Sequence, residues 1–275
     1  MSYIKFLKGE YDKIKKGGSN IFTGDEIIID PYNEKCTDPC KELKTELLPQ
    51  PICGNIENAK IIICSLNPGL GKGDEDIEDK SKAKSKGLPY LREDILEQLN
   101  QYNPNNNFFW ITERAKGTSG YRYWMGKFNQ KNADASLIKN ICKEYNQKGI
   151  EKKEEEEDII TMLSESVATV ELIPYHSVKM TYDMQRELLK CPSVIMLKEY
   201  MQEKIIPSLR EKNQMLCMMR SFESWEITPD EYVANENIIF NKNPRNPSLN
   251  VKNKDFGEKI LDHIRLITDG FTKKI

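Results

Sequence analysis

The segment from Ala59 to Gly71 constrains the fold of this chain more than any other stretch. Its first half is a short apolar run rich in isoleucine, which is typical of a strand buried on both faces of a parallel sheet. Pro68 has no N–H to donate, and Gly69 permits backbone angles that other residues avoid, so the strand must end here. Asn67 is therefore expected at the carboxyl end of the strand, where open α/β sheets bind ligands. By itself, the pattern fits an ordinary Pro-Gly turn equally well.

The rest of the chain alternates between strand-like and helix-like segments. Further apolar runs that predict buried strands lie at residues 167–174, 215–220 and 237–240. Helical patterns lie at residues 1–20, 91–102, 137–147, 193–206 and 255–268. Strands that alternate with helices predict a parallel sheet covered on both faces. A chain of 275 residues suffices for one such domain, which we expect to span residues 1–275.

Three regions are expected to lie outside the central sheet. Residues 1–48 predict an N-terminal helical extension, in which the triplet 27–29 reads as a short strand or turn. Residues 72–88 and 103–160 read as insertions. The mixed-charge run at 72–86 has little to bury, which favours a solvated, mobile loop. The aromatic residues between 108 and 128 predict core packing, with one or two rings left open to stack on a base. The acidic run at 151–158 predicts an exposed loop or the start of a helix.

Composition limits the partners and cofactors. The formal net charge is -2, so contact with nucleic acid must be local. No apolar run approaches the roughly 20 residues that cross a bilayer, and the N-terminus lacks the apolar core of a signal peptide, so we expect a cytoplasmic protein without a membrane partner. The odd number of cysteines, 7, indicates free thiols. With only 2 histidines, no metal or other cofactor is expected. A metal site formed by Cys36, Cys40 and Cys53 is the alternative that the sequence leaves open.

A second loop near the C-terminus carries a related pattern. The apolar residues 237–240 run into Asn241-Lys242-Asn243-Pro244-Arg245-Asn246-Pro247-Ser248, where two prolines exclude a strand. Together with Leu66-Asn67-Pro68-Gly69, this loop resembles the two signature motifs of the uracil-DNA glycosylase superfamily. The first is similar to the Gly-x-Asn-Pro-Gly of the mismatch-specific and single-strand-selective branches, with Ser65 in place of the leading glycine. The second is similar to the single-strand-selective His-Pro-Ser-Pro-Arg-Asn-Pro. In another register, Asn246-Pro247-Ser248 matches the mismatch-specific Asn-Pro-Ser, and both registers stay open.

The resemblance implies a fold and a reaction. The fold would be a three-layer α/β/α sandwich with a central, mainly parallel four-stranded sheet. The reaction would be hydrolysis of the N-glycosidic bond of a base flipped out of DNA, without metal and without a covalent lyase step. Asn67 would hold the attacking water through its amide oxygen. Asn241, at the family's histidine position, would donate to O2 of the base.

The resemblance also implies how the base and the DNA are bound. Backbone N–H groups near Asn67 and Leu70 would stabilise negative charge on the leaving base. The residues implied to line the base pocket are Leu66, Pro68, Gly69, Leu70, Glu171 and His176. Those implied to contact single- or double-stranded DNA are Asn243, Arg245, Asn246 and Ser248, with Arg245 on the loop that enters the duplex.

Glu171 departs from the family pattern. The single-strand-selective branch has an Asn-x-x-Pro whose asparagine reads the uracil edge, and here Glu171-Leu172-Ile173-Pro174 stands in its place. An ionised carboxylate only accepts hydrogen bonds, so it would repel O4 of uracil and prefer an amino-bearing base. A neutral or outward-facing carboxyl is the alternative, and both stay open. His176, in Pro174-Tyr175-His176, is either a proton carrier or a structural residue.

Two classes of function follow. The first is a monofunctional DNA glycosylase that acts on uracil or on another deaminated or mismatched base. The second is a protein that binds nucleobases or nucleic acid without turnover, which the net acidity, Ser65, Glu171 and the long insertions favour. An α/β hydrolase of another small molecule would need a Gly-x-Ser-x-Gly elbow, which the sequence lacks.

Overall fold

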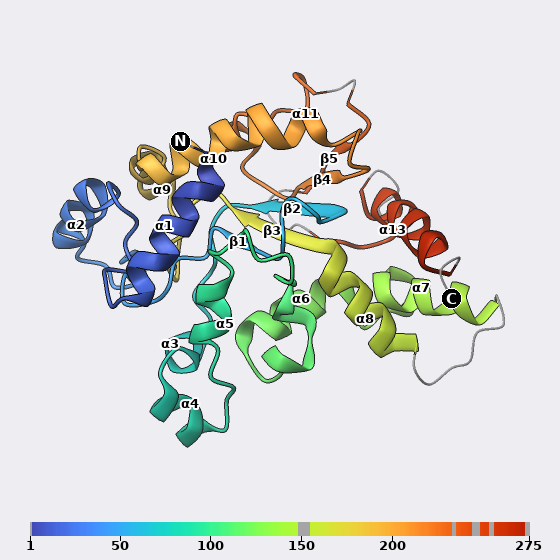
Figure 1. The fold of residues 1–275 in the computed structure, drawn as a ribbon, viewed down its shortest axis with the longest axis horizontal. Coiled ribbons are helices and arrows are strands. Elements are labelled where there is room, and N and C mark those ends of the chain that lie inside the picture. Colours follow the sequence, from blue (N-terminus) through green and yellow to red (C-terminus); the bar gives the residue numbers. More distant parts are fainter. Residues whose placement is uncertain (1, 148–154, 233–234, 244–247, 253–255, 273–275) are drawn as a thin grey trace.

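The computed structural model describes residues 2–147, 155–232, 235–243, 248–252 and 256–272. Within these residues, one five-stranded sheet lies at the centre of an α/β fold (Figure 1). The strand order is β1 (Ile52–Cys53), β3 (Val167–Glu171), β2 (Ile61–Ser65), β4 (Met215–Met218) and β5 (Ile238–Phe240). All neighbouring pairs are parallel except β1 with β3. The predicted parallel sheet is therefore confirmed.

The four parallel strands correspond to the four apolar runs of the sequence. Every residue of β2 is buried, because the strand lies between β3 and β4 and is covered on both faces. The short antiparallel strand β1 was not predicted. It ends at Gly54, whose φ of +94° favours glycine and where a Cβ would lie 2.4 Å from the Val167 carbonyl oxygen. A two-residue strand has too little periodicity to be recognised from sequence.

The N-terminal extension forms two helices. α1 (Tyr3–Lys15) begins at Ser2, whose side chain caps the Lys5 N–H at 3.3 Å. α2 (Glu26–Lys35) contains residues 27–29, so the expected strand or turn is wrong. The helix turns Ile29 into the core and leaves Ile27 exposed, which a short apolar triplet cannot reveal.

The insertion at 72–88 is helical, so the expected mobile loop is wrong. It contains α3 (Asp74–Ile77) and α4 (Lys80–Lys86). The Asp79 carboxylate caps α4 by accepting from the Ser81 and Lys82 N–H groups. Ile77 and Ala83 are the only apolar residues of these two helices, and both are buried. The high charge of this segment therefore predicted a loop where the structure has two short helices.

The remaining elements lie on both sides of the sheet. Figure 1 shows α5 (Arg92–Glu97), α6 (Ser119–Phe128) and α8 (Glu155–Ser166) on one side, and α10 (Pro192–Tyr200) and α11 (Ile206–Ser208) on the other. Of the acidic run, residues 155–158 start α8, and residues 151–154 lie outside the described residues. The other elements are η1 (Phe109–Ile111), η2 (Glu113–Ala115), η3 (Ala133–Ala135), α7 (Leu137–Gln147), α9 (Tyr182–Leu188), η4 (Met201–Ile205), α12 (Phe222–Trp225) and α13 (Gly257–Thr272). None of the described helices has the length and apolar character needed to span a membrane.

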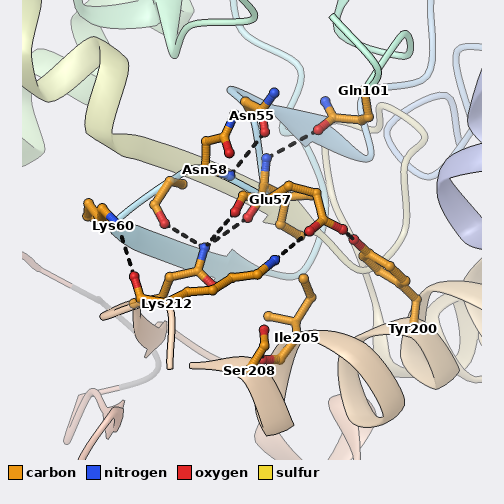
Figure 2. Close-up of polar contacts among 12 residues, drawn as sticks. Asn55, Glu57, Asn58, Lys60, Gln101, Tyr200, Ile205, Ser208 and Lys212 are labelled. Carbon is orange, nitrogen blue, oxygen red and sulfur yellow. Dashed lines mark hydrogen bonds and ion pairs between the residues drawn. The ribbon is translucent and has the colours of Figure 1, made fainter. Parts of the chain in front are cut away.

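At the amino edge of the sheet, polar side chains pair with one another and with the backbone (Figure 2). The fully buried Gln214 amide donates to the carbonyls of Ile56 (3.2 Å), Glu57 (3.3 Å) and Ala59 (2.7 Å). The Glu57 carboxylate accepts from the Tyr200 hydroxyl and from Lys212 Nζ (2.5 Å). This network joins β2, β4 and α10.

Candidate functional site

A cavity of about 460 Å³ opens at the other edge of the sheet, where β2, β3 and β4 end. This is the edge at which parallel α/β sheets bind ligands. The cavity falls within the roughly 300–1,000 Å³ of small-molecule sites. The sequence-predicted residues that line it are Leu66, Asn67, Pro68, Gly69, Leu70, Glu171 and His176. The structure thus brings together the first motif, Glu171 at the end of β3 and His176 in the loop that follows.

The loop after β2 is fixed by the chain that follows β3. The Asn67 Nδ2 donates to the Pro68 carbonyl at 3.2 Å and to Ser177 Oγ at 3.4 Å. These bonds fix the orientation of the amide. No partner for Asn67 Oδ1 is found among the described residues, so this oxygen can still accept a hydrogen bond.

The N–H of Leu70 does not serve the cavity as the resemblance implied. It donates to the Ser177 carbonyl at 3.1 Å, as part of a short parallel bridge between Gly69 and Ser177. A donor already paired with a carbonyl is not available to a leaving base. The expectation for this N–H group is therefore wrong.

The same loop is tied to α6 through an acidic residue. The Asp74 carboxylate accepts from the Gly71 N–H (2.6 Å) and from the Ser119 hydroxyl. A Cβ on Gly71 would lie 2.4 Å from Ser119 Cβ, so only glycine allows this approach. Asp74 and Ser119 both line the cavity, and neither was predicted, because their pairing joins segments that are 45 residues apart.

Glu171 ends β3 and faces the cavity with a buried carboxyl group. Its side-chain Oε2 is buried without a hydrogen-bond partner. Burial raises the pKa of Glu171 to about 8, and the positive charge of Arg220 acts in the opposite direction. At neutral pH the group is therefore mostly the uncharged acid. Of the two alternatives left by the sequence, the structure favours the neutral carboxyl and excludes the outward-facing one.

Arg220 is a cavity residue that the sequence analysis missed. It lies two residues after the buried β4 and lines the cavity, and its Nε is buried without a partner. A charged residue at the end of an apolar strand was the available signal, because parallel strands end at the same edge. Arg220 supplies a positive charge to a wall that also contains the Glu171 carboxyl group.

His176 lines the cavity in a neutral form. Its Nδ1 lies 3.1 Å from the Gly69 carbonyl oxygen, which requires the proton on Nδ1. Burial lowers the pKa of His176, while the backbone of Gly69 and Leu48 acts in the opposite direction. The Nε2 atom is buried and has no hydrogen-bond partner, so it is an acceptor within the lining.

Glu78 was also missed, because it lies in the charged insertion. Its carboxylate accepts from the Leu48 N–H (3.0 Å) and from Arg92 Nη1 (2.8 Å). Burial raises the pKa of Glu78 to about 7, against the effect of the hydrogen bond from Leu48 and of Arg92. Glu78 therefore links the N-terminal extension to the cavity lining.

Aromatic side chains form another part of the lining. Trp110, Tyr123 and Trp124 line the cavity, all from the insertion at 103–160. Trp124 also packs edge-to-face on Phe108, with ring centroids 5.1 Å apart, so most of the cluster is core as predicted. Tyr123 is the exception, with 43% of its surface exposed.

Asn241, the first residue of the second motif, lies at the same edge of the sheet but outside this cavity. Asn241 follows β5, which is separated from β2 by β4. Its Nδ2 donates to the Ser248 carbonyl at 3.0 Å, and its Oδ1 accepts from the Asn243 N–H at 2.9 Å. The amide therefore holds its own loop together and is not in the cavity lining. Arg245 and Asn246 lie outside the described residues.

Comparisons with protein-family models, with curated proteins and with solved structures find no match to this chain. The site is therefore interpreted from its own geometry. Among the described residues, no group of three or more His, Cys, Asp or Glu side chains is placed to hold a metal ion. Cys36 and Cys40 are free thiols, and Cys53 lies buried in the lining.

Proposed function

We propose that this protein hydrolyses the N-glycosidic bond of a nucleobase that has been taken out of a DNA strand. The observation that carries the proposal is that Asn67 Oδ1, still free to accept a hydrogen bond, shares one cavity with the buried Glu171 carboxyl group. The finer fold assignment, a three-layer sandwich of the uracil-DNA glycosylase type, belongs to the same proposal. Support for it is that Asn67 and Asn241 follow parallel strands whose carboxyl ends lie at the same edge of the sheet.

The chemistry assigns a separate task to each group. Asn67 Oδ1 would orient a water molecule toward the anomeric carbon, where a new C–O bond forms as the C–N bond breaks. The bonding electrons leave with the base, whose negative charge the Arg220 cation would stabilise. The proton released by the water can pass to His176, whose neutral Nε2 accepts one. Trp110 and Tyr123 would provide aromatic contact to the base.

The neutral Glu171 changes the expected base preference. A protonated carboxyl offers one donor and one acceptor on the same face, as the family's asparagine amide does. It can donate to O4 of uracil while accepting from N3–H. Uracil is therefore compatible with the site while Glu171 is protonated. Above pH 8, where Glu171 ionises, an amino-bearing base becomes the better match.

A second candidate is a protein that binds a base without cleaving the bond. Two observations favour it: the Leu70 N–H is paired with Ser177, and the Asn241 amide is paired within its own loop. Both groups were expected to stabilise the departing base. Without them, Arg220 and the protonated Glu171 are left to stabilise the negative charge on the base.

The test is a panel of oligonucleotides that contain uracil, hypoxanthine, xanthine or a mismatched base, as single and double strands. Released base and abasic sites are measured with wild type, Asn67→Ala and Glu171→Asn. Base release that Asn67→Ala abolishes supports the hydrolase. Binding of the modified base without release supports the second candidate. Neither binding nor release by wild type on any oligonucleotide contradicts both.

A further inference from the structure

A second hollow lies beside α6 and is larger, about 730 Å³. We propose that this groove binds the single-stranded DNA that flanks the base held in the cavity. The residues that carry the argument are Tyr121, Tyr123, Lys127, Lys131 and Ser248, all in its lining. The proposal rests on the proposed function, because it assigns a place to the rest of the same strand.

The groove and the cavity share one lining residue. Tyr123 lines both, and 43% of its surface is exposed. Its ring packs edge-to-face on Trp124, with centroids 5.1 Å apart, which holds the phenol in place. A base stacked on Tyr123 would therefore be a close neighbour of a base in the cavity.

The charges of the groove suit a phosphate backbone. Lys127 Nζ lies 5.1 Å from the centroid of the Tyr123 ring, and Lys131 is exposed at the rim. No carboxylate is found among the described residues that line the groove. Beside the groove, the Glu156 carboxylate accepts from the Asn129 side chain at 2.8 Å. Lysines beside an exposed tyrosine are the usual means of binding a single strand.

Each hollow contributes one cation near Tyr123: Lys127 lines the groove, and Arg220 lines the cavity. Burial lowers the pKa of Lys127, and the nearby positive charge of Arg220 lowers it further. Two cations that repel one another are both stabilised when a phosphate binds between them. Because Tyr123 lines both hollows, a phosphate of the strand would bind near this residue, where the strand passes from the groove to the cavity.

The strand must be single, because a paired base cannot present its face to a tyrosine ring. The groove also reaches the second motif, since Gln130 Nε2 donates to Ser248 Oγ at 3.0 Å. Ser248, expected to contact DNA, therefore borders the same groove. With a net charge of -2, the protein needs such a local cationic surface to bind DNA.

The experiment measures binding of a fluorescein-labelled, undamaged oligothymidylate by anisotropy over a range of salt concentrations. Tyr123→Ala and Lys131→Ala are compared with two matched controls, Tyr102→Ala and Lys84→Ala, whose side chains are exposed outside both hollows. Tyr123→Ala should weaken binding roughly tenfold through lost stacking. Lys131→Ala should reduce the slope of log affinity against log salt by about 0.7. The controls should bind as wild type does.

Three outcomes overturn the inference. Wild type does not bind the oligothymidylate at low salt, the two control variants lose as much affinity as the groove variants, or the matching duplex binds more tightly than the single strand. The proposed function is measured separately, by base release with the same variants. If wild type releases the base but Tyr123→Ala and Lys131→Ala bind oligothymidylate as wild type does, the groove inference is refuted and the proposed hydrolase activity is not. If both variants weaken oligothymidylate binding but no base is released by wild type, the proposed hydrolase activity is refuted and the groove inference is supported.

Discussion

The two edges of the central sheet differ in how their polar side chains are paired. At the amino edge, the Gln214 amide and the Glu57 carboxylate bond with the backbone and with neighbouring side chains (Figure 2). At the carboxyl edge, Glu171 Oε2, His176 Nε2 and Arg220 Nε are buried without partners. At the amino edge, Gln214 Oε1 is also buried without a partner, but it is not in the cavity lining, whereas the three atoms of the carboxyl edge belong to residues that line one cavity. Unpaired buried polar groups destabilise a fold, so this cluster indicates a place where a ligand supplies the missing partners.

The largest effect is expected for Asn67→Ala. If Asn67 positions the attacking water, base release should fall by at least a hundredfold, the usual cost of misplacing a reactant. Stability should hardly change, because the Asn67 amide makes only two hydrogen bonds, the longer one 3.4 Å. Single-turnover release rates and urea denaturation measure the two quantities. Unchanged release would remove Asn67 from the reaction.

Glu171→Gln tests whether the carboxyl edge lowers stability. The pKa of Glu171 is about 8 in the folded protein and 4.5 when unperturbed, so the folded state binds a proton that the unfolded state releases. Stability should therefore fall as the pH rises between these values. Relative to Glu171→Gln, wild type should lose on the order of 3 kcal/mol between pH about 5 and about 8.

The measurement is the difference in free energy of unfolding between Glu171→Gln and wild type, in urea, at both pH values. Taking the difference cancels the contribution of Glu78, which titrates in both proteins. A difference that stays constant with pH would show that Glu171 is ionised in the folded state.

Gln214→Ala tests the opposite edge. It removes three hydrogen bonds to buried backbone carbonyls and should lower the free energy of unfolding by about 2–3 kcal/mol. Base release per folded molecule should be unchanged, because Gln214 lies at the other edge of the sheet from the cavity. A lower rate of base release per folded molecule would contradict the claim that the amino edge stabilises the fold without affecting the cavity.

The smallest effect is expected for Lys212→Met. The partner Glu57 carboxylate is 42% exposed, and such pairs contribute at most about 1 kcal/mol. Although burial acts to raise the pKa of Glu57, hydrogen bonds from Lys212 and Tyr200 lower it overall. The contribution is thus present above pH 4.5 and is lost as the pH falls further. Thermal unfolding at two pH values measures it, and a loss that persisted in acid would contradict this assignment.

The sequence predicted the parallel strands and the position of Asn67, because both depend on local patterns: apolar runs and the proline that ends them. Glu171 was singled out by the resemblance, from its place three residues before Pro174. Asp74, Glu78 and Ser119 were not found, because tertiary contacts bring them to the cavity.

Asn241 shows a second reason for failure. Its position at the carboxyl edge follows from the strand before it, as expected. The direction of its side chain depends on bonds to Ser248 and Asn243 within one loop, which the motif does not encode. Residue type and edge were thus predictable, and side-chain orientation was not.

The most direct test is a crystal structure of Asn67→Ala bound to a single-stranded oligonucleotide that contains uracil. The account predicts the uracil inside the cavity, with its Watson–Crick edge against Glu171 and a water or solvent gap at residue 67. It also predicts that the unpaired atoms of Glu171 and Arg220 gain partners. Uracil bound elsewhere, with the cavity filled by solvent alone, would contradict it.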